Sequence, residues 1–266
     1  MSSNKLGFID NCVPPNPFPP LWANSWGQDK YGLWASLLIE GVVQVMRWIR
    51  PGIFLMGSPF GEPGRSSDEV LHKVTLTEGY WLADTPCTQK LWEKVMGNNP
   101  SQFKGEEQLP VDSVSWNDCQ EFLRITNDKL NGLKLWHPTE SQWEYACRAG
   151  TLTPYSFGHK ITTEQVNYYG SVHIDSTVAV KALPCNQWGL YQMHGNLWEW
   201  CQDWYGEYSE GASVYPERSD SGEFRILRGG GWIDVSRNVR SASRLRSQPV
   251  VRSNSIGFRF FLGHKG

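Results

Sequence analysis

The sequence predicts a single α+β domain, and three observations support that prediction. First, 14 Trp, 26 Gly and 16 Pro among 266 residues are typical of a compact, loop-rich fold packed around aromatic rings. Second, three short helices with capping signals are expected before residue 150. Third, the later residues show no helical period. We expect an extended N-terminal lead over residues 1–20 and one domain over residues 21–266, because no linker-like composition follows the lead.

Composition excludes several classes of protein. The net charge of −2 provides no basic field that could hold a nucleic-acid backbone, so we expect no nucleic-acid partner. Apolar runs such as Leu37–Ile39 are far shorter than the roughly 20 residues of a membrane helix. We therefore expect no integral membrane segment, and the hydrophobic share of 39% argues against a disordered chain.

Cysteine usage indicates a reduced protein. The chain has six cysteines and no Cys-x-x-Cys pair: Cys12, Cys87, Cys119, Cys147, Cys185 and Cys201. Six cysteines are too sparse for a disulfide scaffold in a chain of this length. We therefore expect buried thiols and, from the sequence as given, a cytoplasmic protein. No basic, apolar and small-residue signal precedes Cys12. A signal peptide removed from the sequence would instead place the protein at the cell surface.

The first elements expected after the lead are β-strands. Leu33–Ile39 and Val42–Ile49 are apolar-rich and flank the tight turn Glu40-Gly41, which predicts a β-hairpin. A further short strand is expected at Ile53–Met56, and a terminal strand at Ile256–Leu262.

The three helices follow the first strands. Thr88–Met96 places its apolar residues on one face. Ser115 and Asp118 form a capping box that starts the second helix, and Thr139 and Gln142 form the box of the third.

Five phrases occur in a characteristic order. They are Phe54-Leu55-Met56-Gly57-Ser58, Pro138-Thr139-Glu140 with Trp143-Glu144-Tyr145-Ala146, Gly189-Leu190-Tyr191 with Gly195-Asn196-Leu197-Trp198-Glu199-Trp200, Leu227-Arg228-Gly229-Gly230-Gly231-Trp232, and Ile256-Gly257-Phe258-Arg259. Together they resemble the formylglycine-generating-enzyme (sulfatase-modifying factor) domain over about residues 50–263. The resemblance implies a C-type-lectin-like fold, with a small twisted antiparallel sheet, two or three helices and extensive ordered loops.

The residues argue against catalysis. In the catalytic members of the resembled family, two cysteines after the Gly-rich turn bind copper, and a soft thiolate pair suits Cu(I). Counted from Trp232, the matching positions hold Asp234 and Val239, and no cysteine follows Cys201. The six histidines, His72, His137, His159, His173, His194 and His264, show no metal-ligand spacing. We expect His137 to be packed rather than catalytic, and no Gly-x-Ser-x-Gly elbow is present.

The resemblance also implies a structural calcium site. The carried-over ligands are the side chains of Gln192 and Glu199 and the carbonyls of Gly195 and Leu197, since oxygen ligands suit this hard cation. Gln192 departs from the Asn or Asp of the calcium-binding members. A metal-free loop is therefore the alternative, and no cofactor is required.

Residues 233–255 predict an ordered surface loop, because they follow neither a helical nor a strand period. Framework residues are expected at Val239–Ala242, Arg244, Gln248-Pro249 and Arg252. Between them lie fifteen candidate ligand-binding residues: Ile233, Asp234, Val235, Ser236, Arg237, Asn238, Ser243, Leu245, Arg246, Ser247, Val250, Val251, Ser253, Asn254 and Ser255. Charged members can form charge-assisted hydrogen bonds and apolar members can supply contact area.

This layout resembles the variable proteins of diversity-generating retroelements, which use the same fold. Their adenine-directed exchange of Asn codons never produces Lys, Glu, Gln, Met or Trp, and none of these five types occurs at the fifteen positions. The resemblance implies a non-enzymatic protein with a diversified surface that recognises a protein partner. A non-varying binding or regulatory module is the first alternative, and a copper-dependent formylglycine-generating oxidoreductase is the second.

Overall fold

A computed structural model describes residues 14–130, 132–169, 175–208, 211–214 and 221–263. Most of the N-terminal lead, together with Cys12, His173 and His264, lies outside the described residues. Within them, Phe18 stacks on Trp81 with ring centroids 6.4 Å apart. No helix of the described part combines the length and apolar character needed to cross a bilayer.

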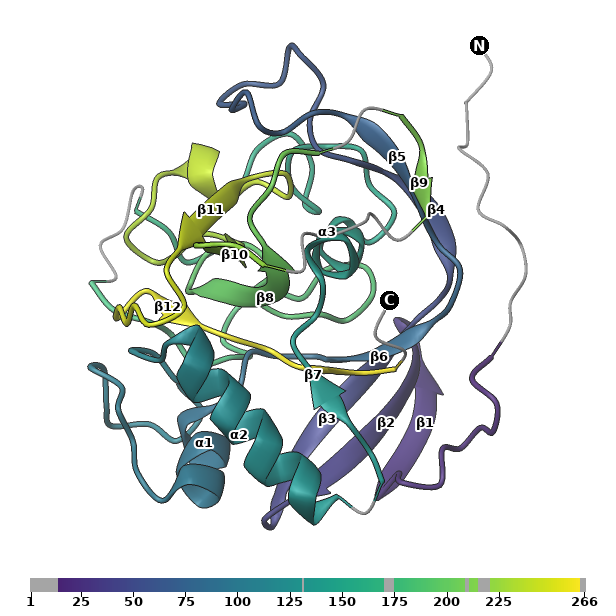
Figure 1. The fold of residues 1–266 in the computed structure, drawn as a ribbon, viewed down its shortest axis with the longest axis vertical. Coiled ribbons are helices and arrows are strands. Elements are labelled where there is room, and N and C mark those ends of the chain that lie inside the picture. Colours follow the sequence, from purple (N-terminus) through teal and green to yellow (C-terminus); the bar gives the residue numbers. More distant parts are fainter. Residues whose placement is uncertain (1–13, 131, 170–174, 209–210, 215–220, 264–266) are drawn as a thin grey trace.

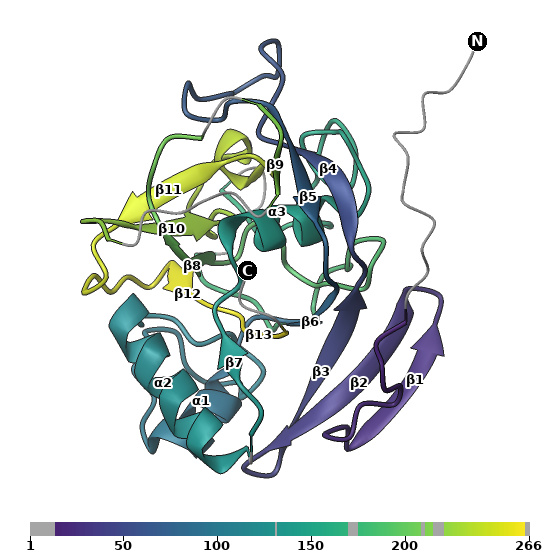
Figure 2. The ribbon, with the colours of Figure 1, turned by 45° about the vertical axis from the view of Figure 1, so that its right-hand side comes forward.

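The hairpin prediction is confirmed and gains a third strand. β2 (Gly32–Ile39) and β3 (Val42–Ile49) pair in antiparallel register around the predicted turn. β1 (Ser25–Asp29), which the sequence did not predict, pairs with β2. β6 (Tyr80–Ala83), β13 (Phe261–Leu262) and β7 (Leu135–Trp136) complete a six-stranded sheet in the order β1-β2-β3-β6-β13-β7. The β1–β2–β3 end projects from the body of the molecule (Figure 2).

The three predicted helices form, each where its capping residue requires. α1 (Gln89–Met96) begins after Thr88, whose side chain accepts from the Leu91 amide. α2 (Trp116–Lys129) and α3 (Glu140–Arg148) both have complete capping boxes, as predicted. Figure 1 shows α1 and α2 side by side. They cover an aromatic core in which Trp92 stacks on Phe122 with centroids 5.4 Å apart.

Two smaller sheets complete the described fold. One has the order β11-β10-β8-β12 and contains β8 (Trp198–Trp204), β10 (Arg225–Arg228), β11 (Arg244–Ser247) and β12 (Ile256–Gly257). The other has the order β4-β5-β9 and contains β4 (Gly52–Met56), β5 (His72–Leu76) and β9 (Ser213–Val214). A short 3-10 helix, η1, spans Ser236–Val239.

The terminal segment corrects one prediction. Ile256–Leu262 is not one strand but two, because the chain leaves one sheet and enters another. β12 pairs in parallel with β8, whereas β13 pairs with β6 and β7. Between them, the carbonyls of Phe258 and Phe260 accept hydrogen bonds from Cys87 and Ala83. The buried crossing therefore fixes the terminal segment between two sheets.

The α+β fold class is confirmed, with three helices and long ordered loops, although the strands divide into three sheets instead of one. The five cysteines of the described part are free thiols, and all of them except Cys185 are buried. His137 is fully buried and stacks on Trp116, as expected for a packed histidine. α3 lies over a second core that contains Phe54, Trp143 and Phe261.

Candidate functional site

Residues 233–255, here named the displayed segment, lie mostly at the surface. Eight of the fifteen candidate residues are exposed: Ile233, Val235, Ser236, Arg237, Leu245, Arg246, Val250 and Val251. Six more are half-buried: Asp234, Asn238, Ser247, Ser253, Asn254 and Ser255. Both views place η1 and β11 together on one side of the molecule, far from β1 (Figures 1 and 2).

Ser243 is the exception and corrects the candidate list. It is only 5% exposed, its hydroxyl donates to the Arg237 carbonyl at 2.9 Å, and its own carbonyl accepts from Arg228. A ligand cannot reach this side chain while these bonds persist. Ser243 therefore holds the displayed segment in place.

The glycine turn before the displayed segment depends on the missing side chain of Gly230. Gly230 has a φ of +78°, and a Cβ on it would lie 2.4 Å from Cγ1 of Val239. A side chain is excluded there by both conformation and space. The turn can therefore pass directly against the end of η1.

Asp234 has an internal role instead of a free carboxylate. Its Oδ2 accepts from Trp198 Nε1 at 2.7 Å and from the Gly231 amide at 2.9 Å, while Oδ1 accepts from the Asn238 side chain at 3.0 Å. These bonds close the loop on itself and satisfy the Trp198 indole. The expectation that Asp234 contributes charge to a ligand is corrected accordingly.

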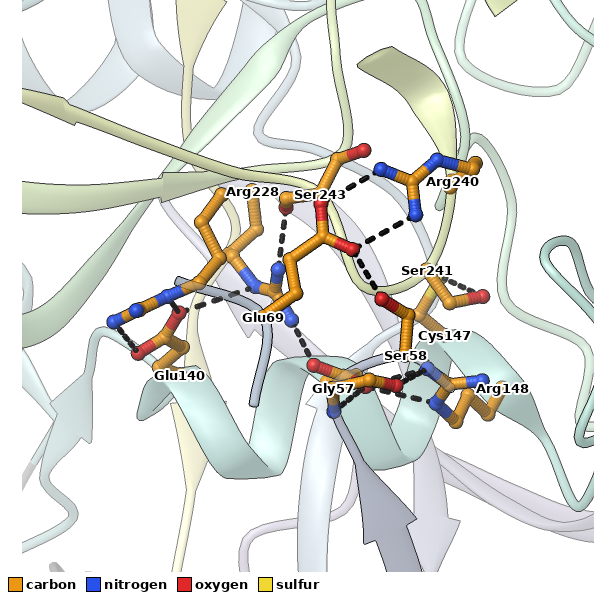
Figure 3. Close-up of polar contacts among 12 residues, drawn as sticks. Gly57, Ser58, Glu69, Glu140, Cys147, Arg148, Arg228, Arg240, Ser241 and Ser243 are labelled. Atoms are coloured by element: carbon orange, nitrogen blue, oxygen red, sulfur yellow. Dashed lines mark hydrogen bonds and ion pairs between the residues drawn. The ribbon is translucent and has the colours of Figure 1, made fainter. Parts of the chain in front are cut away.

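The framework residues Val239–Ala242 and Arg244, here named the anchors, reach into the protein. Val239 through Ala242 are all buried, and the Arg244 side chain is 1% exposed. Arg240 donates to both carboxylate oxygens of Glu69 and to Glu62, at 2.7 to 2.8 Å. Figure 3 shows Glu69 between Arg240 and Ser58, whose hydroxyl donates to it at 2.6 Å. Burial raises the pKa of Glu69, but these hydrogen bonds outweigh it and hold that pKa below its ordinary value.

A second group of buried charges continues along α3. Arg244 Nε donates to Glu140 at 2.7 Å, and Arg228 pairs with both Glu140 and Glu144. Arg148 closes the series by donating to Glu144 at 2.8 Å and to the Gly57 carbonyl at 2.7 Å. Burial raises the pKa of Glu140, yet Arg244 and Arg228 outweigh it and lower that pKa. Alternating charges therefore tie β10 and β11 to α3, as Figure 3 shows for Arg228 and Glu140.

A thiol and an imidazole meet under the anchors, which the sequence did not reveal. Cys147 Sγ lies 3.6 Å from His194 Nε2 and 3.7 Å from Ser241 Oγ, while His194 Nδ1 lies 2.7 Å from the Val239 carbonyl. Burial raises the pKa of the Cys147 thiol to about 12 and lowers the pKa of His194 to about 4. Both groups are therefore neutral near pH 7, so the pair lacks the thiolate of a nucleophile.

Asp234 and Val239, at the positions that match the copper-binding cysteines of the family's catalytic members, do not fit copper. The Val239 side chain has no donor atom and is fully buried, and the oxygens of Asp234 are engaged as described above. Within the described residues, no group of three or more His, Cys, Asp or Glu side chains could hold a metal ion.

The expected calcium ligands do not fit that ion either. Arg259 Nε donates to Glu199 at 2.6 Å and Trp143 Nε1 donates to the same oxygen at 2.7 Å, while Arg259 Nη2 occupies the other oxygen. The Gln192 oxygen accepts from Asn196, and the Gly195 carbonyl accepts from the Leu197 amide. A guanidinium thus supplies the positive charge that an ion would bring.

Comparisons with known proteins agree with this architecture. The model of the sulfatase-modifying factor enzyme 1-like domain matches residues 40–262. The chain is 35% identical over 250 residues to "Serine/threonine-protein kinase pkn1" of Chlamydia caviae, covering 83% of this chain and 38% of that protein. It is 33% identical over 187 residues to "Formylglycine-generating enzyme" of Streptomyces coelicolor, covering 63% and 57%. The chain therefore spans less than two thirds of either relative.

Among solved structures, "Treponema denticola variable protein 1" superposes with a TM-score of 0.78. The two are 27% identical, and the superposition covers 86% of this chain and 98% of that one. The similarity therefore extends over nearly the whole of the solved chain.

Proposed function

The chain belongs to the sulfatase-modifying factor enzyme 1-like domain family, and from this premise we propose that it is a non-enzymatic protein that recognises a protein partner. The displayed segment is the recognition surface. In finer terms, we propose a variable protein of a diversity-generating retroelement, in which the exposed positions are exchanged while the anchors stay fixed.

The observation that best supports this proposal is the separation of two residue classes within one segment. Arg240 and Arg244 point inward to buried carboxylates, whereas Leu245 and Arg246, which follow directly, are exposed. A side chain at an exposed position can change with little effect on stability, because few native contacts depend on it. The buried ion pairs meanwhile keep the backbone ordered, which reduces the entropy lost on binding.

The exposed residues suit contact with another protein. Ile233 and Val250 are 56% and 58% exposed, and both lie in a segment that also contains exposed arginines. Apolar side chains mixed with arginine are typical of the centre of protein interfaces. The likeness to a variable protein over most of the chain supports the same conclusion.

The chemistry of the thiols supports a role without catalysis. Cys147 is buried with a raised pKa, and the positions of the two copper-binding cysteines hold Asp234 and Val239. Oxidation of a substrate cysteine therefore lacks its thiolate ligands. Turnover of a sulfatase-type cysteine peptide with copper present would overturn this part of the proposal.

The gene provides the direct test. The exchanged positions should be encoded by codons that end in C, and a near-copy with Asn codons at those positions should lie close by. Sequencing independent isolates should then find differences concentrated at the exposed positions and absent from Arg240, Ser241 and Arg244. Differences spread evenly over the chain would contradict the proposal.

A second candidate is a binding or regulatory module of fixed sequence. The similarity to part of a protein named as a kinase, over 38% of its length, favours it. This candidate predicts the same fold and the same exposed surface. It differs in one observable, because isolates would then carry the same residues throughout the displayed segment and no near-copy would exist.

A further inference from the structure

β11 lies at the edge of its sheet. It pairs with β10 in antiparallel register, with Leu245 opposite Leu227 and Arg246 opposite Ile226. No other strand of the described residues pairs with it. An edge strand leaves alternate N–H and C=O groups available to another strand. Its two central side chains, Leu245 and Arg246, are both exposed and point to opposite faces of the sheet.

Arg246 is held in place by aromatic rings. Its guanidinium carbon lies 4.5 Å from the centroid of the Tyr205 ring and 5.4 Å from that of Phe224. The Tyr205 hydroxyl donates to Asp68 at 2.9 Å, which fixes the ring that supports the cation. Cation–π contact of this kind orders an arginine without neutralising its charge.

The positive charge of Arg246 is not compensated. Among the described residues, no carboxylate lies within ion-pair distance of Arg246 or of Arg237, whereas Arg244 and Arg252 pair with Glu140 and Asp118. The single acidic residue of the displayed segment, Asp234, is bonded internally. The displayed segment therefore offers ordered positive charge and no free negative charge.

We propose that β11 binds an extended acidic segment of a protein partner, which adds to the sheet as a further strand. The inference rests on the proposed function, since it names the partner chemistry of the same surface. Backbone hydrogen bonds supply affinity in such additions, and alternate side chains supply selectivity. Directly opposed residues share a face, so a carboxylate should lie opposite Arg246 and an apolar side chain opposite Leu245. The partner segment should therefore alternate apolar and acidic residues.

Blocked hexapeptides added to the ¹⁵N-labelled full chain test this inference. One peptide alternates Val and Glu, a second alternates Val and Lys, and a third repeats the first with N-methyl groups on its two central residues. Adjacent N–H groups point to opposite edges of a strand, so the third peptide cannot pair by either edge. We expect the Val-Glu peptide to shift the amide signals of β11, residues 244–247. It should bind at least about tenfold more tightly than either other peptide.

A matched pair of variants separates the role of Arg246 from net charge. Arg246→Gln should reduce the preference for Glu over Lys to about threefold or less, with an unchanged melting temperature. Lys30→Gln removes the same charge from the distant β1–β2 turn and should keep the preference. Equal binding of the Glu and Lys peptides, unimpaired binding of the N-methylated peptide, or signal changes outside β11 would each overturn the inference. So would an absence of binding at about 1 mM peptide.

The failure of this inference can be told apart from a failure of the proposed function. Libraries of the displayed segment that yield binders for several proteins would uphold the proposed function. If the acidic peptide leaves β11 unperturbed in the same protein, only the strand-addition inference fails.

Discussion

Arg240 and Glu69 form a bidentate ion pair, with Nη2–Oε1 and Nη1–Oε2 distances of 2.7 and 2.8 Å, and both side chains are about 2% exposed. The pair links the displayed segment to the loop before β5, across 171 residues of sequence. The proposed exchange of exposed side chains depends on links of this kind.

Arg240→Leu should therefore destabilise the protein strongly. The change leaves Glu62 and Glu69 buried without their cation, which costs about 3–5 kcal/mol. Val250→Ser, in the same segment but exposed, should cost less than about 0.5 kcal/mol. Urea unfolding of both variants measures the difference. Similar losses in the two would show that the segment does not divide into anchors and displayed residues.

Asp234→Ala should loosen the loop that it closes. The Gly231 amide and the Trp198 indole lose their acceptor, at a cost of about 1–3 kcal/mol. Hydrogen exchange at the Gly231 amide should accelerate accordingly. Ser236→Ala is the control, because the hydrogen bond from the Tyr155 hydroxyl goes to the backbone carbonyl of Ser236, which the substitution keeps. An unchanged hydrogen-exchange rate at the Gly231 amide in the Asp234 variant would show that Asp234 does not close the loop.

Stability should depend on two buried histidines. Burial, with Arg225 as a smaller cause, lowers the pKa of His137 to about 3, and burial lowers that of His194 to about 4. The unfolded chain binds these protons near pH 6.5, so protonation favours unfolding. Above that pH the neutral histidines make their full contribution to the free energy of unfolding. As the pH falls toward about 4.5, each histidine lowers that free energy by about 1.4 kcal/mol per pH unit.

His137→Phe isolates one of these contributions. The phenyl ring keeps the stack on Trp116 but cannot titrate. Urea unfolding of the variant should therefore show roughly half of the original slope between about pH 6.5 and pH 4.5. An unaltered slope would mean that His137 takes up its proton in the folded protein.

Calcium should leave the protein unaffected. Glu199 is already neutralised by Arg259, and a bound ion would have to displace that guanidinium. Adding calcium or a chelator should shift the melting temperature by less than about 1 °C, since only ligands that bind the native state raise it. A calcium-dependent increase would restore Gln192, Gly195, Leu197 and Glu199 as a site.

Local signals in the sequence were sufficient to predict the three helices and the hairpin. The capping boxes at Ser115 and Thr139 form between residues three apart, so the sequence displays both partners together. The turn at Gly229 and Gly230 also has a local cause, because both residues have a positive φ, which glycine adopts without strain. The lack of period correctly indicated that most of residues 233–255 lie outside the core, but it did not indicate the strand β11 among them.

Contacts between distant residues could not be predicted in this way. Ser243 is held by Arg228, which donates to its carbonyl, and by the Arg237 carbonyl, which accepts from its hydroxyl. Asp234 turns inward because the Trp198 indole donates to its carboxylate. The Cys147–His194 contact joins residues 47 apart and has no local signature. For the same reason the sequence gives no indication that the terminal segment divides between two sheets.

The central claim is that the exposed positions can be exchanged while the anchors hold the fold. The direct measurement is a library that randomises Ile233, Val235, Leu245, Arg246, Val250 and Val251 together. Its members are scored for folding by protease resistance and for binding to several unrelated proteins. We predict that most members fold and that different members bind different proteins, whereas randomising Arg240, Ser241 and Arg244 abolishes folding. A library at the exposed positions that mostly fails to fold, or that folds but binds none of the proteins, would contradict the account.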